Sequence, residues 1–357
     1  MILGILKEPD QRRVSLVPQM IQKFKQLQCE IIVESGAGEK AGFPDQQYGE
    51  EVMFGSHTEV ISKADLIVSM VKPDAALLDA IPSGKYLVSS FESYMDDQIV
   101  PDLKRRGIEA FGMDMIPRTT LAQSMDVLSS MASIAGYKAV LKAADHLAKY
   151  LPMMITAGGS IKPARVLVIG AGVAGLQAVA TARRLGAIVE VFDTRSAVKE
   201  EVLGLGAKFV EVEGAVEDSA AGGYAVQQTE EYMRKQRELV KERAKAANVI
   251  ITTAQVRGRK APVIITKDIV EEMIPGSVIV DIASSTGGNC ELTEDRKTIS
   301  RNGVVIIGDS ELADTMPQDA SFLYANNLLN FLKLVVREGQ LNPESENEII
   351  QSAWITH

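Results

Sequence analysis

Short apolar runs alternate with longer amphipathic stretches over the first third of the chain. The apolar runs occupy positions 1–6, 30–34, 65–70, 85–90 and 108–112. Their length and continuous apolar character are typical of buried parallel β-strands. Stretches between them, such as 18–27 and 96–106, have apolar residues at helical spacing. This alternation predicts βαβ units and a doubly wound parallel sheet.

A second series of the same kind follows. Its apolar runs occupy positions 165–170, 187–193, 207–212, 248–253, 277–283 and 303–308. Two long helical patterns, roughly 130–150 and 319–337, lie at the junctions between the two series. We therefore predict an α/β fold of two Rossmann-like doubly wound parallel-sheet domains, joined by the long helices, with an interdomain cleft. The predicted domains are 1–129 plus 319–357 and 130–318.

Composition and charge exclude several classes of protein. The chain has 357 residues, enough for two ordinary domains, and a formal net charge of −9. This charge argues against a nucleic-acid partner, which needs a basic surface, and against direct docking on an anionic membrane. The longest uncharged stretch, 166–182, contains three glycines. We expect no transmembrane helix and no direct insertion into a membrane.

The cysteines and the first residues bear on the compartment. Cys29 and Cys290 have no companion Cys or His at zinc spacing. They are expected to be buried thiols in a reducing cytoplasm, and no metal site is predicted. The opening residues, MILGILKEPD, lack the long apolar stretch of a signal peptide and are expected to begin with a β-strand.

A dinucleotide-binding pattern stands in the middle of the chain. Gly170, Gly172 and Gly175 form G-x-G-x-x-G between a predicted strand and a predicted helix. The first glycine permits a tight turn, the second leaves room for a diphosphate, and the third lets the helix pack closely on the sheet. Asp193 ends the next predicted strand, where a carboxylate can bind ribose hydroxyls and repel a 2′-phosphate. Arg195 can instead attract that phosphate. The pattern as a whole predicts NAD(H) binding.

Few residues are suited to acid–base catalysis. Hydride transfer to a metabolite usually also moves a proton, which requires a general acid or base. His57, His146 and His357 do not follow predicted strands, where catalytic residues of this fold are expected. Lys72 and Arg13 do occupy such positions and can bind a carboxylate. They can equally be surface charges or members of interdomain ion pairs.

The segment PRTTLAQSMD, 117–126, carries Arg118, Gln123 and Asp126 without a clear hydrophobic period. Hydride transfer directly between two nicotinamide rings needs no proton relay, only ring positioning and the exclusion of water. The amide of Gln123 can orient a carboxamide or a ribose. Arg118 and Asp126 can hold each other or bind the nicotinamide ribose. The alternative is a polar connecting loop held by its own Arg–Asp pair.

A second candidate loop covers positions 211–228. It is acidic at first and then rich in small residues, with Tyr224 as its single aromatic residue, next to Gly223. Loops of this length usually act as lids or binding loops, and disorder is the alternative. Tyr224 can close over a bound nucleotide.

Several motifs follow one another in a distinctive order. They are PRTTLAQSMDVLSS, AGYKAV, the glycine segment, SAAGGYA, VIITTAQV and VDIASSTGGNC. Together they resemble the NAD(H)-binding component of proton-translocating nicotinamide nucleotide transhydrogenases, over almost the whole chain. The resemblance implies a homodimer that presents NADH to NADP+ held by a partner subunit. It also implies coupling to proton translocation through membrane-spanning subunits, which would keep this cytoplasmic component at the inner membrane.

The resemblance assigns roles to individual residues. It places Arg118, Gln123, Asp126 and Ser129 at the nicotinamide end, the first three as the catalytic group. It assigns Gly170, Gly172, Val173 and Gly175 to the diphosphate and Asp193, Thr194 and Arg195 to the adenosine ribose. Gly223 and Tyr224 belong to a mobile loop, and Gln236 and Gln255 match weaker contact positions.

Alanine dehydrogenase is the main alternative, because it shares the fold and the KEP…RV opening. Arg13 and Lys72 match its substrate-binding positions. Its catalytic His, however, aligns near Ser90, and its catalytic Asp aligns with Ser285. The resemblance therefore argues against oxidative deamination. A nucleotide-sensing module without catalysis is a third hypothesis, against which the complete Arg118–Gln123–Asp126 loop counts.

Overall fold

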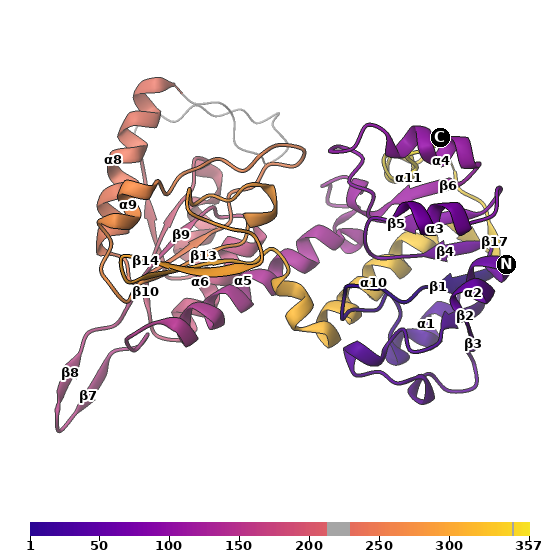
Figure 1. The fold of residues 1–357 in the computed structure, drawn as a ribbon, viewed down its shortest axis with the longest axis horizontal. Helices are drawn as coiled ribbons and strands as arrows, with labels where there is room; N and C mark the ends of the chain where they lie inside the picture. The colour runs from indigo at the N-terminus through magenta and orange to yellow at the C-terminus, as the bar shows by residue number, and fades with distance from the viewer. Residues whose placement is uncertain (213–228, 345) are drawn as a thin grey trace. The chain divides into compact units, whose positions relative to one another are not determined.

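A computed structural model describes residues 1–212, 229–344 and 346–357. These residues form two compact units, Met1–Met131 with Ala313–His357, and Ala132–Leu312 (Figure 1). The chain therefore leaves the first unit and returns to it after completing the second. The boundaries expected from the sequence, 129/130 and 318/319, stay a prediction about independent folding domains.

The first unit is built on a six-stranded parallel sheet. Its strands are β1 (Ile2–Ile5), β2 (Glu30–Glu34), β3 (Met53–Gly55), β4 (Leu66–Val68), β5 (Tyr86–Ser89) and β6 (Glu109–Gly112). They lie in the order β3-β2-β1-β4-β5-β6, and all neighbours are parallel. The chain starts in the middle of the sheet and winds outward in both directions, as in the Rossmann fold. The predicted doubly wound sheet is confirmed.

Helices cover both faces of this sheet. They are α1 (Ile21–Lys25), α2 (His57–Lys63), α3 (Ala75–Ala80), α4 (Ile99–Arg106), α10 (Pro317–Val335) and α11 (Glu348–Ala353). Alternate strand residues point to opposite faces. Leu3 and Val68 pack with α1 and α10 on one face, whereas Ile67 and Leu87 pack with α2, α3 and α4 on the other.

The last residues of the chain are part of the first unit. Phe111 of β6 lies 5.6 Å from Phe331 of α10 and 5.4 Å from Trp354, measured between ring centroids. The indole nitrogen of Trp354 donates to Glu109 Oε2 at 2.7 Å. A two-residue antiparallel pair, β16 (Val336–Arg337) and β17 (Gln340–Leu341), follows α10. The returning segment thus completes the core around β6.

The second unit repeats the arrangement with one added strand. Its sheet contains β9 (Arg165–Ile169), β10 (Ile188–Phe192), β11 (Lys208–Val210), β12 (Val249–Thr252), β13 (Val278–Asp281), β14 (Lys297–Arg301) and β15 (Val304–Gly308). The order is β11-β10-β9-β12-β13-β15-β14. All neighbours are parallel except β14, which pairs antiparallel with β15 at one edge.

Two helical layers also enclose this sheet. The helices are α5 (Val127–His146), α6 (Val173–Arg184), α7 (Lys199–Gly204), α8 (Glu230–Ala246) and α9 (Lys267–Glu271). Val166 and Val168 pack with α5, α6 and α7, while Leu167 and Ile169 pack with α8 and α9. The apolar run of β9 is thus buried on both sides, as expected for a central parallel strand.

The division between the two units falls within α5, which begins three residues before the predicted position.

An antiparallel hairpin, β7 (Met154–Thr156) and β8 (Gly159–Ile161), extends away from the second sheet (Figure 1). Among the residues that the structure describes, no helix has the length and apolar character needed to span a membrane.

Candidate dinucleotide-binding site

The glycine pattern forms a tight turn between β9 and α6. Gly170 has a φ of +95°, a left-handed conformation that favours glycine. A Cβ atom on Gly175 would lie 1.8 Å from the carbonyl oxygen of Gly170, so only glycine allows the helix to start this close to the strand. A Cβ on Gly172 would meet nothing within 4 Å. The turn is therefore tightly packed at Gly170 and Gly175, whereas the space next to Gly172 is open to a ligand.

The first turn of α6 suits an anionic ligand. Gly172 is the N-cap residue and supplies no side chain to the free N–H groups, and the first helical turn contains no acidic residue. Val173, the first residue of α6, is 44% exposed. Unpaired N–H donors and the helix dipole favour a diphosphate at such a position.

Asp193 joins the glycine turn to the end of β10. Its Oδ2 accepts a hydrogen bond from the backbone N–H of Ala171 at 2.7 Å, and its side chain is only 6% exposed. The Arg195 guanidinium donates to both carboxylate oxygens, at 3.0 and 2.8 Å, and this bonding to Asp193 raises the pKa of Arg195. Thr194 lies between them and is half-buried. Asp193 and Arg195 thus form a charge pair joined by two hydrogen bonds beside the turn.

The loop after β12 forms the other side of the turn. Thr253 Oγ1 donates to the carbonyl oxygen of Gly170 at 3.0 Å. Gln255, two residues further on, is exposed, and its Nε2 donates to Thr286 Oγ1 at 3.2 Å. Since β10, β9, β12 and β13 are parallel neighbours, their following loops meet at one edge of the sheet. The structure thereby brings the glycine turn, Asp193 and Gln255 to the same edge.

Other predicted site residues lie elsewhere. Gln236 is half-buried on α8. Gly223 and Tyr224 fall outside the described residues. Arg118, Gln123, Asp126 and Ser129 belong to the first unit, where Arg118 and Gln123 are exposed.

Asp126 has a structural role at the start of α5. Its Oδ1 accepts from the backbone N–H of Ser129 at 2.9 Å, and its Oδ2 accepts from Ser129 Oγ at 2.6 Å. This is the geometry of a helix N-cap, and it explains why α5 begins at Val127. The residue before the helix, three positions after Gln123, therefore both ends the loop and holds its carboxylate at a fixed place against Ser129.

Two asparagines of α10 hold the loop, and neither was predicted from the sequence. Asn327 Nδ2 donates to the carbonyl oxygen of Ser124 at 2.8 Å, and Asn330 Nδ2 donates to the same atom at 3.2 Å. Ser130 Oγ donates to Asn327 Oδ1 at 2.7 Å. The NNLLNF segment carried a signal, because asparagines are unusual on the buried side of a helix.

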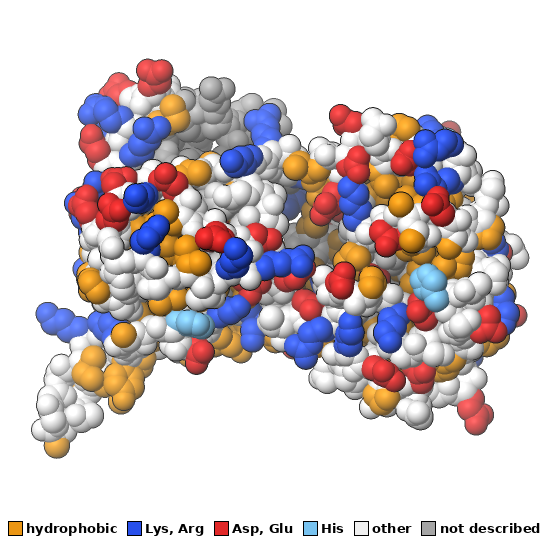
Figure 2. Space-filling model, in the orientation of Figure 1, with side chains coloured by type: hydrophobic (Ala, Val, Ile, Leu, Met, Phe, Trp, Pro, Cys, Tyr) orange, Lys and Arg blue, Asp and Glu red, His pale blue; other side chains and the backbone are white. Residues whose placement is uncertain are grey.

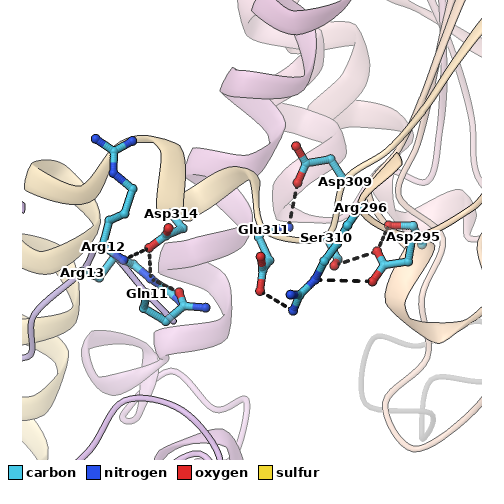
Figure 3. A network of polar contacts seen from close by, with 10 residues as sticks. Gln11, Arg12, Arg13, Asp295, Arg296, Asp309, Ser310, Glu311 and Asp314 are labelled. Atoms are coloured by element: carbon cyan, nitrogen blue, oxygen red, sulfur yellow. Dashed lines mark hydrogen bonds and ion pairs between the residues drawn. The ribbon is translucent and has the colours of Figure 1, made fainter. Parts of the chain in front are cut away.

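Arg13 and Lys72, the two cations expected at an amino-acid site, form ion pairs with carboxylates of the first unit. Arg13 contacts Gln11 Oε1 and lies 3.5 Å from Asp314 Oδ1 (Figure 3). Lys72 Nζ lies 2.6 Å from Asp96 Oδ2. Both ion pairs are thus internal to this unit, so neither is the interdomain pair considered above.

One buried acid was not anticipated from the sequence. Glu8 is 2% exposed, and its Oε1 accepts from the backbone N–H of Met70 at 2.5 Å. Burial raises the pKa of Glu8 to about 7, although the hydrogen bonds from the 69–71 segment and nearby Arg13 act in the opposite direction. Ser90 is half-buried and Ser285 is exposed.

Each of the three histidines contacts another group of the protein. His57 is the first residue of α2, and its Nδ1 lies 2.9 Å from Glu34 Oε2. His146 ends α5 and contacts the carbonyl oxygen of Lys142. His357 stacks on Trp354 with ring centroids 4.5 Å apart.

The sheet order, the glycine turn and the Asp193 carboxylate define a dinucleotide-binding protein of the Rossmann type. Two domain families match the chain, the alanine dehydrogenase/PNT N-terminal domain over residues 4–135 and the C-terminal domain over residues 139–357. The chain belongs to the alanine dehydrogenase/PNT family.

Individual relatives narrow the resemblance. The chain is 40% identical to NAD(P) transhydrogenase subunit alpha of Haemophilus influenzae over 99% of its own length and 70% of that protein. The crystal structure of a transhydrogenase from Sinorhizobium meliloti matches with a TM-score of 0.91 and 39% identity, covering 100% of this chain and 99% of that one. An L-alanine dehydrogenase structure matches with a TM-score of 0.78 and 22% identity, covering 99% of this chain and 100% of that one, which shows a shared fold. The likeness to a transhydrogenase component is confirmed.

Proposed function

We propose that the chain is the NAD(H)-binding component of a proton-translocating NAD(P)+ transhydrogenase. In this role it exchanges a hydride between its own NADH and NADP+ held by a partner subunit. The observation that carries the proposal is that serines, Ser90 and Ser285, stand at the two positions that the resemblance assigns to acid–base groups, whereas Gln123 is present and exposed. Ring-to-ring transfer moves only a hydride with its electron pair, so it needs no such group. The 40% identity to a transhydrogenase subunit supports the same conclusion.

The residues of the second unit bind the adenosine half in this proposal. The N–H groups at the start of α6 bind the diphosphate above Gly172. Asp193, Thr194 and Arg195 bind the adenosine ribose, and Gln236 and Gln255 add weaker contacts. A 2′-phosphate would face the carboxylate of Asp193, while Arg195 is already paired with it. NAD(H) is therefore preferred to NADP(H).

The residues of the first unit bind the nicotinamide half. Gln123 orients the carboxamide or ribose, and Arg118, Asp126 and Ser129 fix that end of the molecule. NADH supplies the hydride, and NADP+ on the partner accepts it, giving NAD+ and NADPH. Gly223 and Tyr224 are proposed to close over the nucleotide; they lie outside the described residues. Proton translocation belongs to membrane-spanning partner subunits, which hold this cytoplasmic component at the inner membrane.

A homodimer is part of the proposal, and hairpin β7–β8 supports it. Ile155 and Met153 are 72% and 61% exposed, and Tyr150 and Ile161 are also exposed. Figure 2 shows hydrophobic side chains along this hairpin. An isolated two-stranded hairpin is marginally stable in water, and clustered exposed apolar side chains mark contact surfaces. A second copy covering the hairpin satisfies both requirements.

The test is a transfer assay. The purified chain should bind NADH and, mixed with the NADP-binding subunit of its complex, should reduce NADP+ at the expense of NADH. Binding without transfer would instead indicate a sensing module. An amino-acid dehydrogenase is the second candidate, favoured by Arg13 beside the buried Glu8. Oxidation of NADH with pyruvate and ammonia, in the absence of the partner, would establish that activity.

A further inference from the structure

A turn of two glycines and an asparagine follows β13. Gly287 and Gly288 have φ values of +103° and +78°, both left-handed. A Cβ on Gly288 would lie 2.7 Å from Asp281 Oδ2, and one on Gly287 would lie 2.7 Å from Lys260 Cε. The left-handed backbone therefore favours glycine at both positions, and at Gly288 the Asp281 carboxylate adds a steric reason. At Gly287 the nearby atom belongs to the flexible Lys260 side chain, which can move away. The turn directs Asn289 inward, where its exposed fraction is 0%.

Asn289 holds both ends of the segment 254–262. Its Nδ2 donates to the carbonyl oxygens of Ala254 and Pro262, at 2.7 and 2.9 Å. Its Oδ1 accepts from the backbone N–H of Ala254 at 2.9 Å. Both amide protons and the amide oxygen are thus used on one segment of chain. Ala261 adds a backbone bond to the carbonyl oxygen of Thr286 at 2.9 Å.

The segment held by Asn289 begins next to the glycine turn. Thr253 precedes Ala254, and its backbone N–H donates to the carbonyl oxygen of Ile169 at 2.8 Å. Its Oγ1 donates to the carbonyl oxygen of Gly170 at 3.0 Å and would lie 2.6 Å from a Cβ at Gly170. Thr253 therefore supports the glycine turn through the carbonyl oxygen of Gly170. The two bonds between Ala254 and Asn289 in turn fix the position of Thr253.

We propose that Asn289 is a positioning residue for dinucleotide binding, which acts by fixing the 253–262 segment against the glycine turn. Gln255 lies within this segment, so the same bonds set its position at the sheet edge. The role rests on the dinucleotide binding proposed above. The glycine turn at Gly170–Gly175 binds the nucleotide, and Asn289 determines how rigidly this turn is supported by the 253–262 segment.

The segment carries its own reporter. Arg257, Arg259 and Lys260 are trypsin sites inside it, so the rate of cleavage there measures its order without any nucleotide. In Asn289→Ala, loss of three hydrogen bonds should raise this rate and the Kd for NADH by about tenfold or more. Asn289→Asp keeps the shape and the acceptor but loses both donors, and should show the same two effects.

Asn248→Ala is the matched control. Its Oδ1 accepts from the backbone N–H of Arg165 at 3.0 Å, at the opposite edge of the same sheet. It should lower the thermal unfolding midpoint without raising the Kd for NADH or the cleavage rate within 254–262. Thr253→Val removes the side-chain bonds to the carbonyl oxygens of Gly170 and Ile169 but keeps the bonds between Ala254 and Asn289. It should weaken NADH binding with little change in cleavage.

The outcomes separate the two proposals. NADH binding by folded Asn289 variants within about twofold of wild type, or unchanged cleavage in 254–262, would overturn the role of Asn289. If both Asn289 variants fail to fold, unchanged NADH binding by Thr253→Val would overturn it. A wild-type chain that binds no NADH would contradict the proposed function instead, while the cleavage comparison would still report on the segment.

Discussion

Asn327 and Ser124, 203 positions apart in the chain, are joined by a 2.8 Å hydrogen bond from the side-chain amide to the backbone carbonyl. Ser124 directly follows Gln123, so this bond fixes the backbone beside the side chain proposed to orient the nicotinamide. Asn330 contributes a longer bond to the same oxygen. The loop is therefore held by a helix that arrives almost at the end of the chain.

Asn327→Ala should slow hydride transfer more than it weakens NADH binding. Freeing Ser124 lets Gln123 move, and small displacements of a positioning group can lower the rate by up to about 100-fold. We expect transfer to NADP+ on the partner subunit to fall by about tenfold or more, with the Kd for NADH changed by less than about threefold. Asn330→Ala should have the smaller effect, since its bond is longer. Equal effects on rate and binding would contradict this role.

Gln123→Asn tests the proposed catalytic residue itself. The shorter side chain retains the amide but displaces it by one methylene, so transfer should slow by about 10- to 100-fold. Binding of NADH to the isolated chain, followed by the nucleotide's fluorescence, should change little. Parallel losses of transfer and binding would remove the orienting role given to Gln123.

Asp193→Asn tests nucleotide selection. The variant retains an acceptor for Ala171 N–H but loses the charge that repels a 2′-phosphate and pairs with Arg195. The ratio of the Kd values for NADPH and NADH should fall by about tenfold or more, because a charged hydrogen-bonding group is lost. Arg195→Ala, which leaves the carboxylate in place, should preserve the preference for NADH. Calorimetric titration of both nucleotides provides the comparison.

Glu8 should make stability depend on pH. Its pKa in the folded chain, about 7, lies above the ordinary value of 4.5, so the folded state binds more protons between these values. Stability contributed by neutral Glu8 is therefore lost as the pH rises through this window. Relative to wild type, Glu8→Gln should gain on the order of 3 kcal/mol of unfolding free energy between about pH 5 and about pH 8.

Urea unfolding at several pH values provides the measurement. Glu59→Gln is the control, because Ser56 holds the pKa of this exposed carboxylate below its usual value. The stability that Glu59 contributes is lost as the pH falls, so its pH dependence has the opposite sign. Identical pH profiles for Glu8→Gln and wild type would contradict the assignment.

Ile155→Asp should separate the proposed dimer. Placing a charge on the most exposed apolar side chain of hairpin β7–β8 penalises burial against a second copy. Sedimentation velocity should show a dimer for wild type and a monomer for the variant at the same concentration. Met53→Asp, an exposed apolar position in the first unit, should remain dimeric. A monomeric wild type would contradict the assembly directly.

The sheets could be predicted from the sequence because their strands are continuous apolar runs. The run containing β9 was found in this way, since burial on both faces removes the polar positions that blur shorter signals. Strand β3 has only three residues, and β14, at an edge of the sheet, has Ile299 as its single apolar residue. Hairpin β7–β8 has a mostly exposed surface. None of these three elements was predicted, because none has a long apolar run.

The glycine turn and Asp193 were predictable because their spacing along the chain is fixed by strand and helix lengths. Asn289 and Asn327 were not, because their roles depend on contacts with Ala254 and Ser124 that only tertiary structure creates. The start of α5 was misplaced for a local reason, since Asp126 was interpreted as a ligand-binding residue and is also a helix cap.

The return of the chain to the first unit has a consequence for biosynthesis. Phe331 and Trp354 close the core around β6. The strands of the first sheet are therefore translated early, but their hydrophobic core stays incomplete until these residues have left the ribosome. The second unit is one continuous segment, so it can finish folding while the core of the first unit is still incomplete. We therefore expect the inserted second unit to complete its fold during synthesis before the first unit that flanks it in the sequence.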